Sequence, residues 1–191
     1  MSEDQRKTIQ SGCEGIRVQY IYSACIKTIT PDVAVLHDPW FTEGIYDGSW
    51  FHFPEVQDPC RSIGDVDLVY VSHIHPDHYD PRFLKEYFSR YGVKPILIAD
   101  HAPNHLAGKM RADGLEPTVV KDPLMIGSTT IRILPCRTGS LSDIDSAIVI
   151  QYPDSAGRVH CVVNTNDVVF EDPLRRRLKA MAGEVDILLC G

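Results

Sequence analysis

Residues 71–80 read VSHIHPDHYD and place three histidines and an aspartate within six positions, directly after the apolar run DLVYV. The apolar run predicts a short buried strand. Asp80 and Pro81 then predict the start of a helix, with Asp80 as the N-cap and Pro81 at the first helical position. We therefore expect a strand that ends in a turn, and a helix that braces this turn.

The side chains gathered in this turn are of the types that bind metal ions. His73 and His75 alternate as strand residues do, so we expect them to point the same way. Asp77 and His78 follow in the turn itself. Two or three imidazoles with a carboxylate suit Zn or another borderline divalent metal such as Fe or Mn. A histidine standing alone is more often a hydrogen-bonded or exposed side chain, and this interpretation applies to His52, His101, His105 and His160.

The order of elements predicts an α/β fold. Strands are expected within residues 16–29, 33–39, 67–72, 95–100, 117–120, 128–135, 146–153, 158–167 and 185–191, and helices within 81–91, 102–114 and 172–183. A long loop, residues 40–59, separates the early strands from the histidine-rich turn. Many strands with interspersed helices fit two sheets packed face to face with helices outside. Residues 1–15 are expected to be a flexible N-terminal segment, and residues 16–191 one domain.

The motif HIHPDH resembles the H-x-H-x-D-H hallmark of the metallo-β-lactamase-fold superfamily and matches it at every fixed position. VAVLHDPW is similar to an early strand of that family that ends in Asp-Pro, here Asp38 and Pro39, and supports the metal turn from behind. VVNTND is similar to a later strand that ends in a metal-bridging aspartate, here Asp167. The resemblance runs from about residue 16 to the end of the chain and implies an αββα sandwich. The DPW and NTND stretches are more loosely similar to the branch that holds sugar-lactone hydrolases and relatives of the sialic-acid hydroxylase.

The resemblance also implies a role for each motif residue. His73 and His75 would bind a first metal ion, Asp77 and His78 a second, and Asp167 would bridge the two. Asp77 would also orient the bridging water, which makes it the expected catalytic residue. In such a site the ions lower the pKa of water, polarise the scissile bond and stabilise the leaving group.

The chain departs from this family pattern in the middle. The family supplies a further histidine between the motif and the bridging aspartate, but no histidine lies between His105 and His160. Cys136 directly follows a predicted strand at the expected place, and a thiolate is an acceptable Zn ligand. The alternative is a small buried thiol at a strand end. Asp143 and Asp145 are the next candidates.

A second departure lies at the end of the chain. The family carries a last histidine after the strand that corresponds to VDILLCG, and residues 185–191 are the last of this sequence. An apolar strand needs a neighbour on each side. We therefore expect the domain to lack its C-terminal portion. Three explanations are open: the chain is a fragment, a partner chain or a second copy completes it, or the site is reduced.

Composition limits the partners and the compartment. The net charge of −7 excludes a broad nucleic-acid-binding surface, because phosphate contacts need clustered Lys and Arg. The basic run at 175–177 fits a solvated helix face. No stretch has the length and hydrophobicity of a membrane span. Scattered cysteines without a secretion signal indicate free thiols in a cytoplasmic protein.

Three functions remain open. The first is a metal-dependent hydrolase acting on a phosphoester, lactone or amide of a small-molecule substrate. The second is a non-catalytic or regulatory module that has lost ligands, and the third is an iron-dependent oxidative enzyme, since the same His and Asp residues bind iron. Five aromatic residues in the long loop either contact substrate over the metal or form a small apolar core: Trp40, Phe41, Trp50, Phe51 and Phe53.

Overall fold

The computed structural model describes residues 15–136, 144–169 and 172–190, and its strands form two sheets. The six-stranded sheet has the order β1-β2-β3-β4-β5-β6, with β1 (Arg17–Tyr22), β2 (Cys25–Ile29), β3 (Ala34–His37), β4 (Leu68–Tyr70), β5 (Ile96–Ala99) and β6 (Pro117–Val120). The five-stranded sheet has the order β11-β10-β9-β8-β7, with β7 (Leu124–Ile126), β8 (Thr129–Pro135), β9 (Ser146–Pro153), β10 (Val159–Asn164) and β11 (Ile187–Leu189). The helical elements are α2 (Ile45–Gly48), α3 (Pro59–Ile63), α4 (Pro81–Tyr91), α5 (His105–Ala112) and α6 (Asp172–Ala182).

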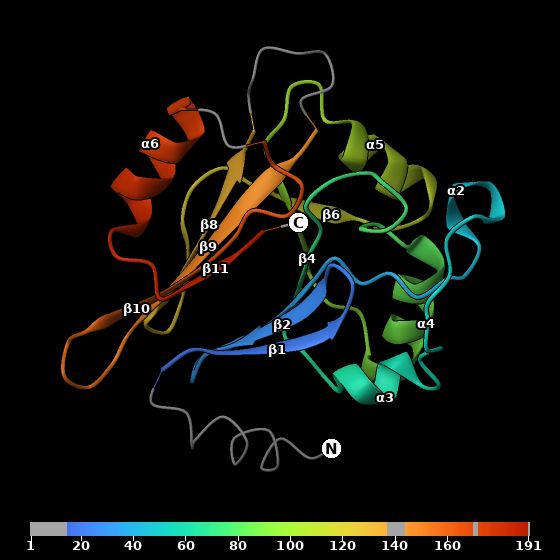
Figure 1. Cartoon of the computed structure of the whole chain (residues 1–191), viewed down its shortest axis with the longest axis horizontal. Coiled ribbons are helices and arrows are strands. Elements are labelled where there is room, and N and C mark those ends of the chain that lie inside the picture. Colours follow the sequence, from blue (N-terminus) through green and yellow to red (C-terminus); the bar gives the residue numbers. More distant parts are fainter. Residues whose placement is uncertain (1–14, 137–143, 170–171, 191) are drawn as a thin grey trace.

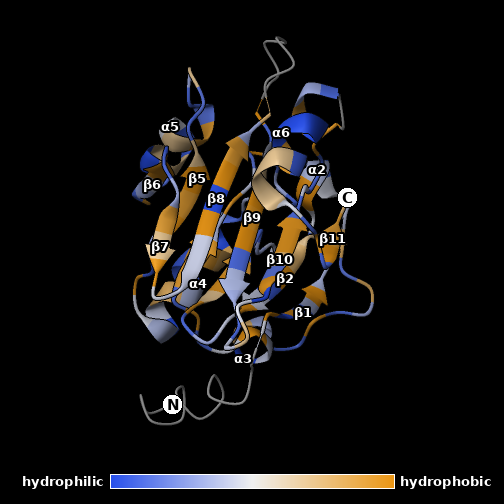
Figure 2. Ribbon diagram, turned by 90° about the vertical axis from the view of Figure 1, so that its left-hand side faces the viewer, coloured by the Kyte–Doolittle hydropathy of each residue, from blue (hydrophilic) through white to orange (hydrophobic). Residues whose placement is uncertain are grey.

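Three clusters of buried side chains hold four layers together. Between the sheets, Val35 and Tyr70 of the first sheet pack with Ile148 of the second. The outer face of the first sheet packs against α3, α4 and α5, and the outer face of the second packs against α6, whose Leu174 and Leu178 are buried. Figure 1 shows α6 on one side of the molecule and α3, α4 and α5 on the other, and Figure 2 shows hydrophobic residues concentrated on the strands between them. The predicted αββα sandwich is confirmed.

The helix start predicted at Asp80 is confirmed, and the same carboxylate fixes the long loop. Asp80 Oδ1 accepts hydrogen bonds from the backbone amides of Arg82 and Phe83, both at 3.0 Å. Its Oδ2 accepts from the amides of Phe41 and Thr42, at 3.0 and 2.7 Å. One buried N-cap therefore ties the start of the loop to the helix that braces the histidine turn.

Some local predictions were wrong. The strand expected through residue 72 ends at Tyr70, and the histidines that follow lie in a bend rather than in strand alternation. The reason is that Ser72 gives its backbone N–H to the side chain of Asp38, at 2.7 Å, instead of continuing the ladder. β7 and the short helix α3 were also not predicted, because each is shorter than the windows in which periodicity can be recognised.

β11 pairs with β10 in parallel and is the edge strand of its sheet. Leu188 on this edge is 54% exposed. The expectation that a further segment or partner chain lies beside β11 stays a prediction. Among the described residues no helix combines the length and the hydrophobicity needed to cross a bilayer.

Candidate metal centre

Asp38 holds the histidine turn in place through contacts of its carboxylate. It is fully buried at the end of β3, with a left-handed φ of 41°, which Asp tolerates better than most residues. Its carboxylate accepts hydrogen bonds from Ser72 N at 2.7 Å and Ser72 Oγ at 2.8 Å. Asp38 Oδ2 also lies 3.1 Å from His78 Nδ1. The expected support of the metal turn by Asp38 is confirmed.

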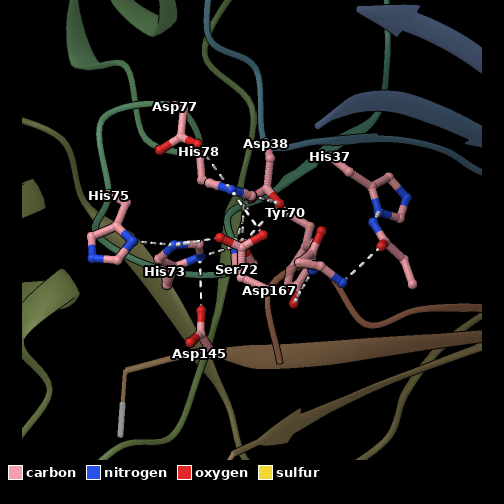
Figure 3. A network of polar contacts seen from close by, with 12 residues as sticks. His37, Asp38, Tyr70, Ser72, His73, His75, Asp77, His78, Asp145 and Asp167 are labelled. Carbon is pink, nitrogen blue, oxygen red and sulfur yellow. Dashed lines mark hydrogen bonds and ion pairs between the residues drawn. The ribbon is translucent and has the colours of Figure 1, made fainter. Parts of the chain in front are cut away.

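Three of the predicted ligands converge. The group consists of His73, His78 and Asp167, whose candidate ligand atoms all lie within 4.8 Å of one another. Asp167 Oδ2 is 3.8 Å from His73 Nε2, and Asp167 Oδ1 is 3.4 Å from His78 Nε2. Both histidines are buried, whereas the Asp167 side chain is 43% exposed. Figure 3 shows Asp167 facing the two imidazoles.

Each of these two histidines has a carboxylate close to its Nδ1 atom. Asp145 Oδ1 lies 3.0 Å from His73 Nδ1, as Asp38 Oδ2 lies 3.1 Å from His78 Nδ1. The hydrogen-bond contact of His73 Nδ1 is with Ser72 Oγ, also at 3.0 Å, so the carboxylate of Asp145 acts on this ring mainly through its charge. A negative charge beside Nδ1 favours the tautomer with the proton on that nitrogen, which leaves the Nε2 lone pair to bind a metal ion. The two Nε2 atoms are the ones that face Asp167. The donor set and its orientation therefore fit a divalent metal.

Charge in this cluster shifts the pKa values of its members. Burial lowers the pKa of His78, but the hydrogen bond and charge of Asp38, with the charges of Asp77 and Asp167, outweigh burial and raise it to about 9. Burial acts to raise the pKa of Asp145, but the contact with His73 outweighs it, so the pKa is lowered. Because a metal ion binds the deprotonated nitrogen of an imidazole, the raised pKa of His78 means that metal binding there competes with protonation.

His75 and Asp77 adjoin this group from the solvent side. His75 is exposed, and its Nδ1 lies 2.9 Å from His73 Nε2. Asp77 Oδ2 lies 3.5 Å from His78 Nε2. The structure therefore brings the whole H-x-H-x-D-H motif together, with its first and last histidines buried and its two middle residues nearer to solvent.

Cys136 is not a member of the converging group. Its side chain is buried and belongs to the apolar cluster of the second sheet and α6, which also contains Leu134 and Ala147. Its backbone N–H donates to the carbonyl of Asp145 at 2.8 Å, and it is the Asp145 carboxylate that reaches His73. The geometry favours the packed-thiol alternative, and metal ligation by Cys136 stays a prediction. Asp143 lies outside the described residues.

The part played by Asp145 was the main feature that sequence reasoning missed. The sequence suggested it only as a replacement ligand, whereas the structure places it on the far side of the His73 ring from Asp167. The signal in the sequence was slight: an isolated aspartate directly before β9.

The long loop forms a small apolar core, and one of its aromatic residues also lines a cleft at the candidate centre, whereas contact with a substrate stays a prediction. Trp40 is buried and Phe41 packs on Phe83 of α4, with ring centroids 4.7 Å apart, which is a small apolar core. Trp50, 48% exposed, lines a cleft of about 400 Å³ whose wall includes Asp77, His78 and Asp167. Phe51 and Phe53 are exposed.

These features define a class of protein: an αββα sandwich with a candidate metal centre of histidines and carboxylates at the ends of its strands. Within this class the chain belongs to the β-lactamase superfamily domain family, whose model matches residues 17–189.

Two curated relatives match most of this chain. A protein from Mycolicibacterium smegmatis that is named as a Rieske 2Fe-2S iron–sulfur protein is 33% identical over 145 residues, which is 70% of this chain and 26% of that protein. The cytidine monophosphate-N-acetylneuraminic acid hydroxylase of Cricetulus griseus is 23% identical over 158 residues, which is 80% of this chain and 27% of the hydroxylase. The chain thus spans about a quarter of the length of each relative.

Solved structures show the same fold. The diiron β-hydroxylase CmlA from Streptomyces venezuelae has a TM-score of 0.58 and 20% identity, covering 92% of this chain and 34% of that one. The isothiocyanate hydrolase from Delia radicum gut bacteria has a TM-score of 0.63 and 18% identity, covering 88% of this chain and 69% of that one. The fold is therefore found in proteins of both oxidative and hydrolytic function.

Proposed function

We propose that this chain is the metal-bearing domain of an iron-dependent enzyme that hydroxylates a small-molecule substrate. The observation that carries the proposal is the convergence of His73 Nε2, His78 Nε2 and the Asp167 carboxylate. Two histidines and one carboxylate with open positions beside them are the donor set typical of non-haem Fe(II) oxygenases. Bound iron would supply the activation of dioxygen at this place.

The surrounding residues support iron over zinc. Among the described residues, the converging group consists of two imidazoles and one carboxylate. Carboxylates lie on both sides of the histidines, with Asp77 and Asp167 on the cleft side and Asp38 and Asp145 behind. Oxygen-rich sites suit iron and manganese at least as well as zinc.

The curated relatives also support oxidative chemistry. One is named as an iron–sulfur protein and the other as a hydroxylase. Hydroxylation of a C–H bond by dioxygen inserts one oxygen atom and reduces the other to water, so it consumes two electrons and two protons. An external electron donor of the iron–sulfur class would supply these electrons.

In this proposal the protein's own residues divide the work. The buried pair His73 and His78 holds the metal, each ring being oriented through Nδ1 by its carboxylate. The cleft beside Asp77 and Trp50 admits the substrate and brings it close to the exposed side of the centre. The described cleft wall carries no Lys or Arg, which favours a substrate that does not have to be bound through an anionic group.

Hydrolysis by a Zn or Mn form of the same centre is the second candidate. It is favoured by the position of Asp77, whose carboxylate lies on the cleft wall 3.5 Å from His78 Nε2. There it could orient a water molecule toward a phosphoester, lactone or amide, as a general base does. This candidate requires no electron donor.

Metal analysis and oxygen uptake separate the two. The protein, prepared without added metal, is analysed for Fe, Zn and Mn, then loaded anaerobically with Fe(II) and exposed to dioxygen with a chemical reductant. We expect iron to be retained, a visible absorption change on oxidation, and oxygen uptake that Asp167→Ala abolishes. Tight binding of zinc or manganese alone, with hydrolysis of model esters and no oxygen uptake, would replace the first candidate by the second. Protein without affinity for any of the three metals would end both.

A further inference from the structure

Tyr46 reaches the metal centre from the long loop, and the family motif does not include it. Its Oη donates a hydrogen bond to Asp77 Oδ1 at 2.6 Å across 31 residues of sequence. The other oxygen of the same carboxylate, Asp77 Oδ2, lies 3.5 Å from His78 Nε2. The two oxygens of Asp77 thus have different neighbours, one a phenol and the other the metal-binding side of a histidine.

The backbone at Tyr46 is held in an unfavourable conformation. Tyr46 has φ 50° and ψ 57°, and Asp47 has φ 57° and ψ 37°, so two consecutive non-glycine residues are left-handed. A bulky side chain seldom adopts this conformation because its Cβ approaches the following carbonyl oxygen. Such strain persists only where the surroundings enforce it, and it gathers at functional sites.

The surroundings of Tyr46 do enforce it. Gly44 N donates to Trp50 O at 2.9 Å and Trp50 N donates to Ile45 O at 3.2 Å, which closes residues 44–50 into a tight loop. The Tyr46 ring packs edge-on against the Trp50 ring, with centroids 5.0 Å apart. The hydrogen bond of Tyr46 to Asp77 is made with the backbone in this strained conformation.

We propose that Tyr46 is a positioning residue that holds Asp77 with Oδ1 on the phenol and Oδ2 on the side of His78 Nε2, where it would be available as a metal ligand. A neutral donor on Oδ1 leaves Asp77 its negative charge and restricts it to one ligand oxygen. It also fixes the side chain before the metal arrives, so less rotational freedom is lost on binding. This inference rests on the metal centre of the proposed function, but not on its iron or its oxidative chemistry.

The alternative is that Tyr46 only packs the loop, and two variants distinguish these roles. Tyr46→Phe removes the hydroxyl and keeps the ring on Trp50. Tyr22→Phe is the matched control, since Tyr22 Oη accepts from Phe53 N at 2.6 Å and donates to Phe53 O at 2.9 Å, in the same loop but away from Asp77. Each variant loses one phenol hydroxyl: that of Tyr46 belongs to this loop, and that of Tyr22 makes hydrogen bonds with the loop.

The experiment is an anaerobic titration with Co(II), followed by its visible ligand-field spectrum and by equilibrium dialysis. Because outer partners of metal ligands are typically worth about 10–100-fold in affinity, we expect Tyr46→Phe to weaken Co(II) binding by about tenfold and to change the spectrum. Tyr22→Phe should leave both within twofold of the wild type. Urea unfolding of the metal-free proteins should be the same for the wild type and Tyr46→Phe.

A double-mutant comparison makes the assignment specific to Asp77. In an Asp77→Ala background, Tyr46→Phe should have no further effect on Co(II) affinity, because the group it positions is gone. An equal loss in both backgrounds, or an unchanged affinity and spectrum in Tyr46→Phe alone, would overturn the inference. So would a wild-type protein that binds no Co(II). Normal cobalt results together with a protein that takes up no oxygen would refute the proposed oxidative function and leave the role of Tyr46 standing.

Discussion

The two halves of the H-x-H-x-D-H motif differ in what holds them. His73 and His78 are buried, and each has a carboxylate on its Nδ1 atom. His75 and Asp77 lie toward solvent, where they are held by a neighbouring imidazole and by Tyr46. Side chains fixed by buried charge are preorganised before a ligand binds, whereas exposed ones must be ordered on binding. We therefore expect the buried half to contribute more to metal affinity than the exposed half, of which Asp77 lies on the cleft wall.

The largest expected effect follows from removing one histidine from each half. His78→Ala should weaken metal binding by more than about 100-fold, because it removes a ligand rather than an outer partner, and outer partners alone are typically worth about 10–100-fold. His75→Ala should weaken it by only about tenfold. Equilibrium dialysis with Zn(II) and Fe(II) measures both. His160→Ala is the control, because His160 lies near the start of β10, at the end of that strand remote from the candidate metal centre. Equal losses in the two variants would show that the comparison is wrong.

The next effect concerns two buried histidines whose surroundings differ. His37 is fully buried beside Asp38, but its Nε2 has no hydrogen-bond partner among the described residues. Burial lowers its pKa from 6.5 to about 4, although the charge of Asp38 acts to raise it, whereas the pKa of His78 is raised to about 9. Neutral His37 therefore stabilises the fold above pH 6.5, and this contribution is lost as the pH falls from 6.5 through about 4.

The expected loss at His37 is about 3 kcal/mol over this range, from a shift of about two and a half units at about 1.4 kcal/mol each. Urea unfolding of metal-free protein at several pH values measures it. His37→Asn should be less stable at neutral pH but should lose less stability on acidification than the wild type. His78 acts with the opposite sign, since the stability from its raised pKa is present below pH 6.5 and is lost as the pH rises through about 9. A wild type and His37→Asn with parallel pH profiles would refute the assignment.

A smaller effect is expected from the carboxylates behind the histidines. Asp38→Asn and Asp145→Asn keep the shape of each side chain but remove the charge that orients His78 and His73. Each should weaken metal binding by about 10–100-fold. Asp38→Asn should also lower the free energy of unfolding, because Asp38 holds Ser72 as well. Asp167→Asn is the reference, because it shows how much metal affinity is lost when a proposed direct ligand is changed. Metal affinities of Asp38→Asn and Asp145→Asn that equal the affinity of the wild type would show that the histidine rings need no orienting partner.

The smallest effect on metal binding is expected at Cys136. If its thiol is only packed between Leu134 and Ala147, Cys136→Ser should leave Zn(II) affinity unchanged and lower the free energy of unfolding by about 1–2 kcal/mol, the cost of burying a hydroxyl. If the thiolate is a ligand, Zn(II) affinity should fall and Cys136→His should preserve it. Dialysis and urea unfolding on the same three proteins decide between these outcomes.

The sequence by itself determined the class of fold and predicted the candidate ligands. Periodicity and the Asp80–Pro81 helix start are local signals, and HIHPDH places its donors close together through the chain alone. Asp38 and Asp167 could be proposed because VAVLHDPW and VVNTND resemble two stretches of the metallo-β-lactamase-fold pattern, although the strands they follow, β3 and β10, belong to different sheets.

Only the tertiary structure decided which atoms of these residues face one another. Asp145 is 72 positions from His73 in the chain, and Tyr46 is 31 positions from Asp77, yet both pairs are in contact. Neither pairing has a local pattern, because each depends on how the two sheets stack and how a strained loop folds over the centre. The same holds for Cys136, since one residue's difference at a strand end decides whether a side chain enters the apolar core or the metal site.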